Sequence, residues 1–194
     1  MSETTPSREA TKTRLIEAAI EEFGERGIDA TSVEQLCERA GFTRGAFYSN
    51  FQTKDDLCIA VLEYNREQIL QQLAVAFSAE PEGDLDWALN VALPGFFESL
   101  NPTMNARLTM LEIRLRATRV PELQQRLKDF ESETKPKMEA ILTELAESLG
   151  AHFSLALGDL ISVAEAIYLH QLLEGDDDRL LKATVSALVT TGRA

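Results

Sequence analysis

The apolar residues of this chain recur with helical spacing along most of its length, and no segment shows the alternation expected of a β-strand. The first predicted helix begins near Ser7 and ends at Gly27, because glycine suits the backbone conformation that closes a helix. Its apolar stripe comprises Leu15, Ile16, Ala19, Ile20 and Phe23. This spacing predicts an all-α fold in which the helices bury their stripes against one another.

Three further helix starts follow closely, and each is marked by a hydroxyl side chain. Thr31, with Glu34 three residues later, predicts the capped start of a short helix. Gly41 ends that helix, Thr43 caps a second and very short one, and Thr53 opens a long third one. The inward side chains of the first short helix are predicted to be Val33, Leu36, Cys37 and Ala40. Two short helices joined by a glycine turn, with longer helices before and after, are typical of a helix-turn-helix.

The charge of the chain restricts how it can bind nucleic acid. The formal net charge is -13 at pH 7, which excludes indiscriminate binding through overall basicity. Residues 1–55 hold seven Lys and Arg against ten Asp and Glu, so even this stretch is acidic. Any contact with DNA must therefore come from a local arrangement of donors.

The second short helix supplies the candidate base contacts. Arg44, in its first turn, is the natural bidentate donor to guanine O6 and N7. Gly45 lets the helix approach the DNA backbone closely, and the methyl groups of Thr43 and Ala46 suit a thymine methyl. The residues predicted to hold phosphates, without reading sequence, are Tyr48, Ser49, Asn50 and Lys54.

Further phosphate contacts are predicted at helix starts. Thr31 and Ser32 cap a helix whose N-terminal amides and dipole can hold a phosphate. One of three basic residues that precede or open the first helix is also predicted to reach a phosphate or groove: Arg8, Lys12 and Arg14. Taken one at a time, the threonines suit ordinary helix caps and the arginines suit ordinary solvated charges. Taken together at this spacing, these residues indicate DNA recognition. Phe47 and Phe51 are assigned to packing.

The stretch from Arg14 to Leu57 resembles the TetR/AcrR family of regulators almost position by position. The resemblance covers roughly the first third of the chain. It is carried by Ala18 to Phe23, Gly27, Thr31 to Val33, Ala40 to Thr43, Gly45, Phe47, Tyr48, Phe51, Lys54 and Leu57. It departs at Cys37, where the family usually has alanine, and at Asn50, where histidine is common.

The resemblance implies two domains and a function. An N-terminal three-helix, helix-turn-helix DNA-binding domain would occupy residues 1–53, with the family domain extending into the linking helix to about 70. A C-terminal helical bundle for ligand binding and dimerisation would occupy residues 54–194. The implied protein is a homodimer, paired through its last two helices, that represses transcription at a palindromic operator and is released by a small-molecule effector. The alternative is a regulator gated by a protein partner or acting without a ligand.

The C-terminal part predicts further helices. One spans 84–100 and is kinked at Pro94–Gly95. The next, after Pro102, buries a stripe of Met104, Leu108, Leu111 and Leu115. Another begins near Val120 and bends or restarts at Pro136. The last two span 157–173, which is apolar on nearly every side, and 179–191.

The family places its effector inside this bundle. The candidate wall residues are Trp87, Phe96, Phe97, Met104, Arg107, Met110, Leu111, Arg114, Phe130, Tyr168 and His170. For each of the apolar and aromatic candidates, plain core packing is favoured. Arg107 and Arg114 lie on an apolar stripe and need a partner. An internal pair with Glu98 or Glu112 is favoured over a carboxylate or phosphate of the ligand. For His170, a satisfied position in the dimer interface is favoured over a hydrogen bond to a ligand.

Several function classes lack support in the sequence. A third interpretation, an enzyme or an unrelated helical interaction module, finds no nucleophile motif, phosphate-binding glycine loop or metal-ligand cluster. We therefore predict no catalysis, cofactor or metal. Cys37 and Cys58 are predicted core residues. Residues 1–12 lack the apolar segment of a secretory signal, and no apolar run is long enough to span a bilayer, which predicts a cytoplasmic protein without a membrane partner.

Overall fold

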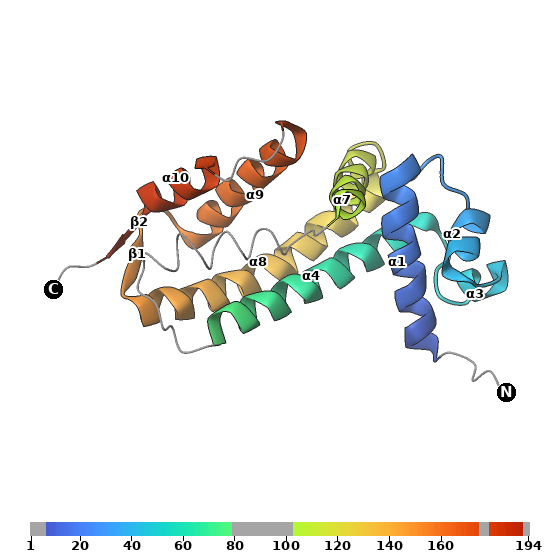
Figure 1. Cartoon of the computed structure of the whole chain (residues 1–194), viewed down its shortest axis with the longest axis horizontal. Helices are drawn as coiled ribbons and strands as arrows, with labels where there is room; N and C mark the ends of the chain where they lie inside the picture. Colours follow the sequence, from blue (N-terminus) through green and yellow to red (C-terminus); the bar gives the residue numbers. More distant parts are fainter. Residues whose placement is uncertain (1–6, 79–102, 175–178, 192–194) are drawn as a thin grey trace. The chain divides into compact units, whose positions relative to one another are not determined.

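The computed structural model describes residues 7–78, 103–174 and 179–191, and most of them are helical (Figure 1). The chain divides into two compact units. The first contains residues 1–66 and 101–130, and the second contains residues 67–100 and 131–194. The predicted all-α class is confirmed. The boundary predicted at residue 53 divides the chain by function and stays a prediction.

Helix α1 (Arg8–Arg26) has the predicted ends. The Ser7 hydroxyl accepts a hydrogen bond from the Ala10 amide at 3.2 Å, which caps the first turn. At the other end, Gly27 adopts φ 82°, a conformation that other residues rarely take. Leu15, Ala19 and Phe23 of the predicted stripe are all 0% exposed. The apolar spacing therefore identified the buried face of this helix correctly.

Helices α2 (Val33–Ala40) and α3 (Arg44–Tyr48) form the predicted helix-turn-helix. Gly41 closes α2 in the left-handed region at φ 71°. The amide of Phe42 then donates to the Cys37 carbonyl at 2.8 Å, so the turn satisfies the last carbonyls of α2. These bonds keep the connection between the two helices short.

Of the two predicted caps of α2, only Ser32 is one, and the predicted capping box of Thr31 with Glu34 is wrong by one residue. Ser32 is the N-cap, and it forms a reciprocal capping box with Gln35. Thr31 is only 1% exposed, and its hydroxyl donates to the carbonyls of Glu22, at 3.2 Å, and Gly27, at 2.8 Å. The Thr31 hydroxyl is thus engaged by α1 and the loop after it, which leaves Ser32 to cap α2.

Helix α4 (Lys54–Ser78) begins at the predicted position. The Thr53 amide donates to the Asp56 carboxylate at 2.9 Å, and the Asp56 amide donates to the Thr53 hydroxyl at 3.1 Å. Cys58 on α4 is 0% exposed and Cys37 on α2 is 3% exposed, which confirms both as core residues. Burial raises the pKa of the Cys58 thiol to about 12, so it stays protonated at neutral pH.

Helix α7 (Met104–Ala117) buries a different face from the predicted one. Its buried residues are Thr109, Met110, Ile113 and Ala117. Three of the four residues of the predicted stripe are exposed: Met104 at 61%, Leu108 at 39% and Leu115 at 46%. The reason is the close crossing with α1, which brings the Thr109 hydroxyl to the Ile20 carbonyl at 2.7 Å. A polar residue with such a partner can be buried without penalty.

The remaining elements are α8 (Pro121–Leu149), β1 (Ala151–Phe153), α9 (Leu157–Glu174), α10 (Arg179–Leu188) and β2 (Val189–Thr191). Helix α8 continues through Pro136 and does not restart there. The predicted last helix is too long, because residues 189–191 pair antiparallel with β1, in the register Ala151 to Thr191. β-branched residues such as these favour extended backbone when a partner strand is present.

The predicted helix over 84–100, with its kink at Pro94–Gly95, lies outside the described residues. Within the described ranges, no helix is both long and apolar enough to cross a membrane.

The crossing of α1 and α7 generates a test. A methyl group added at Gly24 would lie 2.5 Å from Cα and 2.6 Å from the carbonyl oxygen of Asn105. Backbone atoms cannot move aside easily, so Gly24→Ala should lower the free energy of unfolding by about 1 to 3 kcal/mol. The matched control is Gly45→Ala, where the nearest atom, Thr43 Oγ1, lies at 3.7 Å. That variant should leave stability unchanged or raise it. Urea unfolding followed by circular dichroism measures both, and equal effects would contradict the prediction.

Candidate nucleic-acid interface

Helix α3 contains only five residues, and one buried side chain holds it in place. Phe47 is 0% exposed, and its ring centroid lies 5.3 Å from that of Tyr48 and 5.8 Å from that of Phe51. A helix this short is not stable by itself. Burial of Phe47, with Phe51 at 4% exposure, therefore fixes where α3 lies, and the predicted packing role of both residues is confirmed.

The other face of α3 is open to solvent. Its exposed residues, which we call the α3 surface, are Thr43, Arg44, Gly45, Tyr48 and Ser49. Thr43 caps the helix, since its hydroxyl accepts from the Ala46 amide at 3.4 Å. Tyr48 is 50% exposed, a high value for a large aromatic side chain. The α3 surface offers a guanidinium, hydroxyls and a phenol, which are groups that contact base edges and phosphates.

Arg44 is held on this surface by two neighbours. Its Nη1 donates to Oε1 of Glu34 on α2, and its Nη2 donates to the Tyr48 phenol at 3.5 Å. The guanidinium carbon also lies 5.8 Å from the centroid of the Tyr48 ring. The hydrogen bond with Tyr48 and the charge of Glu34 raise the pKa of Arg44 above its ordinary value. Because a guanidinium has about five N–H donors, most of them remain available to another partner.

The end of α3 uses two of the predicted phosphate ligands. The Ser49 hydroxyl donates to the Ala46 carbonyl at 2.9 Å, and Nδ2 of the Asn50 side chain donates to the same oxygen at 2.8 Å. Asn50 is half-buried, whereas Ser49 is exposed. These bonds close the helix, and the phosphate contacts of both residues stay predictions.

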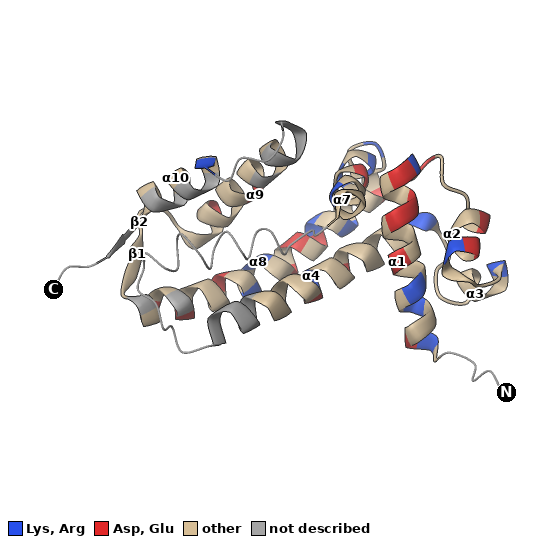
Figure 2. Cartoon of the chain, viewed as in Figure 1, with Lys and Arg blue, Asp and Glu red and all other residues tan. Residues whose placement is uncertain are grey.

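Basic side chains from the N-terminal end of α1 lie next to α3 and the turn before it. The Arg14 guanidinium is 4.7 Å from the centroid of the Phe42 ring, and Arg8 Nη2 donates to the Ser49 carbonyl at 3.4 Å. Figure 2 shows blue segments near this end of α1 and red segments nearer its C-terminal end. Positive charge therefore gathers beside the α3 surface although the chain as a whole is acidic.

Lys54 has a structural role that sequence reasoning missed. Its Nζ donates to the Ile28 carbonyl at 2.6 Å and to the Thr31 carbonyl at 2.7 Å. These bonds connect the start of α4 to the loop between α1 and α2. An ammonium group has about three donors, so one is left for the predicted phosphate contact.

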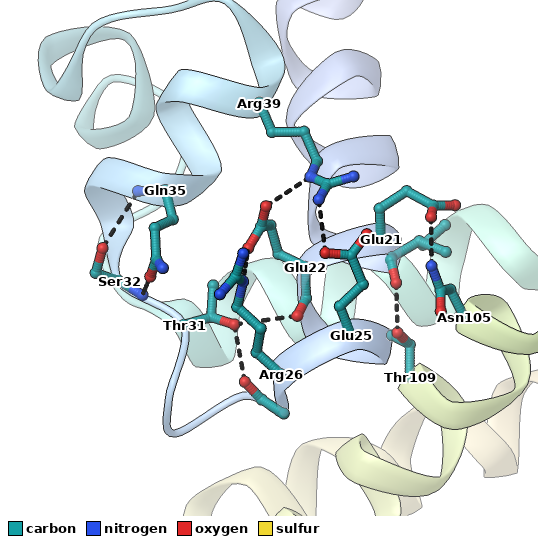
Figure 3. Close-up of polar contacts among 12 residues, drawn as sticks. Glu21, Glu22, Glu25, Arg26, Thr31, Ser32, Gln35, Arg39, Asn105 and Thr109 are labelled. Carbon is teal, nitrogen blue, oxygen red and sulfur yellow. Dashed lines mark hydrogen bonds and ion pairs between the residues drawn. The ribbon is translucent and has the colours of Figure 1, made fainter.

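Two acidic residues of α1, Glu22 and Glu25, form ion pairs with arginines (Figure 3). Glu22 is 5% exposed and accepts from Arg39 Nε at 2.6 Å and from Arg26 Nε at 3.0 Å. Arg39 also donates to Glu25 at 2.8 Å. The hydrogen bond with Glu22 raises the pKa of Arg39. These pairs neutralise much of the acid that lies close to the helix-turn-helix.

Comparison with known proteins agrees with this geometry. Residues 15–61, which contain α2, α3 and most of α1, match the family described as "Bacterial regulatory proteins, tetR family". The regulator AcrR of Shigella flexneri, described as an HTH-type transcriptional regulator, is 31% identical over 105 residues. That match covers 53% of this chain and 48% of AcrR, so the chain spans about half the length of this relative. Residues 15–61 of the chain are therefore similar to regulators of the TetR/AcrR family.

Solved structures share the fold of this chain over almost all of its length. A transcriptional regulator of the AcrR family from Aquifex aeolicus superimposes with a TM-score of 0.61 at 20% identity, covering 91% of this chain and 96% of the other. FadR from Bacillus subtilis, solved in complex with stearoyl-CoA, has a TM-score of 0.61 at 20% identity. The superposition with FadR covers 90% of this chain and 87% of the FadR chain. At these identities the likeness concerns the fold alone.

Helix α7 is joined to the helix-turn-helix by hydrogen bonds that no sequence pattern suggested. Asn105 Nδ2 donates to the Glu21 carboxylate at 2.6 Å, next to the bond between Thr109 and the Ile20 carbonyl (Figure 3). Glu112, which we expected to pair with Arg107 or Arg114, accepts from the Ile28 amide at 3.4 Å. The loop after α1 therefore depends on α7 for one of its backbone partners.

Arginines complete this connection. Arg116, near the end of α7, forms ion pairs with Asp29 in the loop after α1 and with Asp55 at the start of α4. Arg126 on α8 donates to Asp56 at 2.8 Å. The hydrogen bond with Asp55 raises the pKa of Arg116. Each of these pairs joins residues at least 61 positions apart, so local patterns could not reveal them.

The predicted effector residues are spread over different surroundings. Trp87, Phe96 and Phe97 lie outside the described residues, as does the side chain of Tyr168. Met110 is 4% exposed and belongs to the core of the first unit, whereas Met104 and His170 are exposed. Half-buried positions are occupied by Arg107, Leu111, Arg114 and Phe130. The guanidinium of Arg66 covers the Phe130 ring at 4.9 Å.

A groove of about 500 Å³ lies in the second unit, and none of the predicted effector residues lines it. Its walls come from the end of α8, from β1 and from the start of α9, and include Thr143, Glu147, His152 and Leu157. No sequence pattern predicted this groove, because the β1 segment that forms one of its walls was not predicted.

The start of α4 generates a test of pH dependence. Burial opposes ionisation of Asp56, but hydrogen bonds from Arg126 and from Thr53 outweigh it and hold the pKa of Asp56 below its ordinary value of 3.8. A lowered pKa contributes stability that is present above pH 3.8 and is lost as the pH falls through the folded-state pKa.

Asp56→Asn should therefore lower the free energy of unfolding at pH 7 by about 1 kcal/mol or less. The difference from wild type should shrink progressively below about pH 4, where both chains lose the carboxylate. Thermal unfolding measured from pH 2 to pH 7, in steps of about one unit, checks this. Glu17→Gln, at an exposed position of α1, is the control. A difference that persists undiminished at the lowest pH would contradict the prediction.

Proposed function

We propose that this protein is a sequence-specific DNA-binding transcription repressor that inserts α3 into the major groove of a palindromic operator. The observation that carries the proposal is the exposed α3 surface, held by buried Phe47 beside the basic end of α1. A recognition helix must combine a fixed position with free side chains, and α3 has both.

Each residue of the interface has a role that its surroundings support. Arg44 retains donors for guanine O6 and N7, while the methyl groups of Thr43 and Ala46 suit a thymine methyl. Phosphates would be held by Arg14, Ser32, Tyr48, Ser49, Asn50 and Lys54, and by the backbone near Thr31. The main correction to the sequence reasoning is that Thr31 contributes through its backbone position, since its hydroxyl is turned inward.

A homodimer fits this function, because a single α3 surface covers only half of a palindromic site. We propose that the pairing surface is formed by α9 and α10. Helix α9 contains Asp159, Glu165 and Glu174 but no lysine or arginine, and Leu180 at the start of α10 is 48% exposed. Apolar surface of this kind is typical of an obligate interface.

Release by a small molecule is the second part of the proposal. FadR, which shares the fold, binds stearoyl-CoA. In the second unit of this chain, Gln72 Oε1 is buried and has no hydrogen-bond partner among the described residues. A ligand that donates to this oxygen would satisfy it, since buried acceptors are almost always paired. The alternative is a regulator that responds to a protein partner or to no ligand.

The role of Arg44 generates a sharp prediction. Arg44→Ala should lower affinity for the operator by about 1 to 3 kcal/mol and abolish preference at one base pair per half-site. Arg119→Ala, which removes an exposed arginine near the end of α7, is the matched control and should change neither property. Fluorescence anisotropy with operators substituted one base pair at a time measures the preference. Equal losses on operator and random DNA would show that Arg44 contacts only phosphates.

The function as a whole is tested with the DNA that flanks the gene of this protein. A mobility-shift assay should show one retarded complex that contains two chains, and its affinity should fall steeply as salt rises. Stearoyl-CoA and other candidate effectors are then titrated into the complex. Release of the DNA by an effector would correspond to a coupling free energy of about 1 to 3 kcal/mol between effector binding and DNA binding. It would favour ligand-gated repression over the alternative without a ligand. A monomer that binds operator and random DNA equally would overturn the proposal.

A further inference from the structure

Glu34 is an acidic side chain that contacts the α3 surface from outside α3. It is the second residue of α2, its side chain is 57% exposed, and its carboxylate accepts from Arg44 Nη1 at 2.5 Å. Arg44 is exposed to a similar extent, 59%. An ion pair this open to solvent contributes little to stability, so folding alone does not explain its placement.

The contact has a geometric effect on Arg44. An arginine side chain has many rotamers, and a free one would sample bases and phosphates alike. Here Glu34 holds the guanidinium from α2 while Tyr48 holds it from within α3, through the hydrogen bond and the ring contact. Arg44 is therefore positioned before any partner arrives, which reduces the entropy lost on binding.

The contact also has an electrostatic effect. Glu22 and Glu25 are neutralised by Arg39 on the side of α1 that faces α2, whereas Glu34 lies beside the α3 surface itself. A carboxylate at that place repels phosphates of any sequence and lowers affinity for all DNA. It also occupies Arg44, which would otherwise be free to bind a phosphate.

We propose that Glu34 is a positioning residue for Arg44 that raises sequence discrimination at the expense of overall DNA affinity. The inference rests on the proposed function, and it adds a residue outside the recognition helix to the specificity of the site. Glu34 keeps the guanidinium in the orientation that suits guanine and weakens complexes in which Arg44 would bind a phosphate instead.

The test compares binding to the operator with binding to random DNA for wild type, Glu34→Ala and Glu34→Gln. For Glu34→Ala, the ratio of operator affinity to random-DNA affinity should fall by about 5-fold or more. A change of about 5-fold corresponds to the lower end of the discrimination that one bidentate base contact provides. Affinity for random DNA should rise, and the dependence of log affinity on log salt should steepen by about 0.9, which corresponds to one added phosphate contact. Glu34→Gln keeps an acceptor oxygen, so its ratio should lie between those of wild type and Glu34→Ala.

Two controls separate this effect from general charge. Glu38→Gln removes the same charge from an exposed position one turn further along α2, and it should leave the ratio unchanged. In the Arg44→Ala background, Glu34→Ala should no longer alter the ratio, because a positioning residue has nothing left to position. Thermal unfolding of each variant confirms that the helix-turn-helix is folded.

The outcomes are distinct. An unchanged ratio for Glu34→Ala, an equal fall for Glu38→Gln, or a fall that persists without Arg44 would each overturn the inference while leaving the proposed function intact. If wild type itself fails to distinguish the operator from random DNA, the proposed function fails, and the inference fails with it.

Discussion

The ring of Phe47 is completely withdrawn from solvent, and the position of the five-residue helix α3 depends on it. So short a helix cannot persist by its own hydrogen bonds. Its caps, Thr43 at one end and the bonds from Ser49 and Asn50 at the other, satisfy its terminal groups but do not determine where it lies. Burial of Phe47 against the core of the first unit does so, and everything proposed for Arg44 follows from that anchoring.

A chain with a net charge of -13 can present a DNA-binding surface because its charges are sorted locally. Arginines from α1 and α2 pair with Glu22 and Glu25 of α1, and basic residues at the start of α1 lie beside α3. Glu34 is the exception, since it brings an acid to the α3 surface. Phosphate attraction falls off within about 10 Å at ordinary salt, so this local arrangement matters more than the net charge.

The first unit is more than a helix-turn-helix, because α7 and the start of α8 belong to it. Gly24 lets α1 approach α7 closely, and Arg116 reaches both the loop after α1 and the start of α4. The buried face of α7 follows from this contact. A displacement of α7 would therefore act on the segments that hold α2 and α3, through ion pairs and hydrogen bonds that connect distant parts of the sequence.

By itself, the sequence determined the features that depend on neighbouring residues. Helix starts at Ser7 and Thr53, glycine ends at Gly27 and Gly41, and the inward face of α2 were predictable, because caps and turns act over three or four residues. The tertiary structure alone decided which face of α7 is buried, that Ser32 replaces Thr31 as a cap, and that Lys54 and Arg116 connect separate elements. It also decided that residues 189–191 form a strand. Each of these outcomes depends on a partner far away in the chain, and such a partner is identified only when folding brings it within hydrogen-bonding distance.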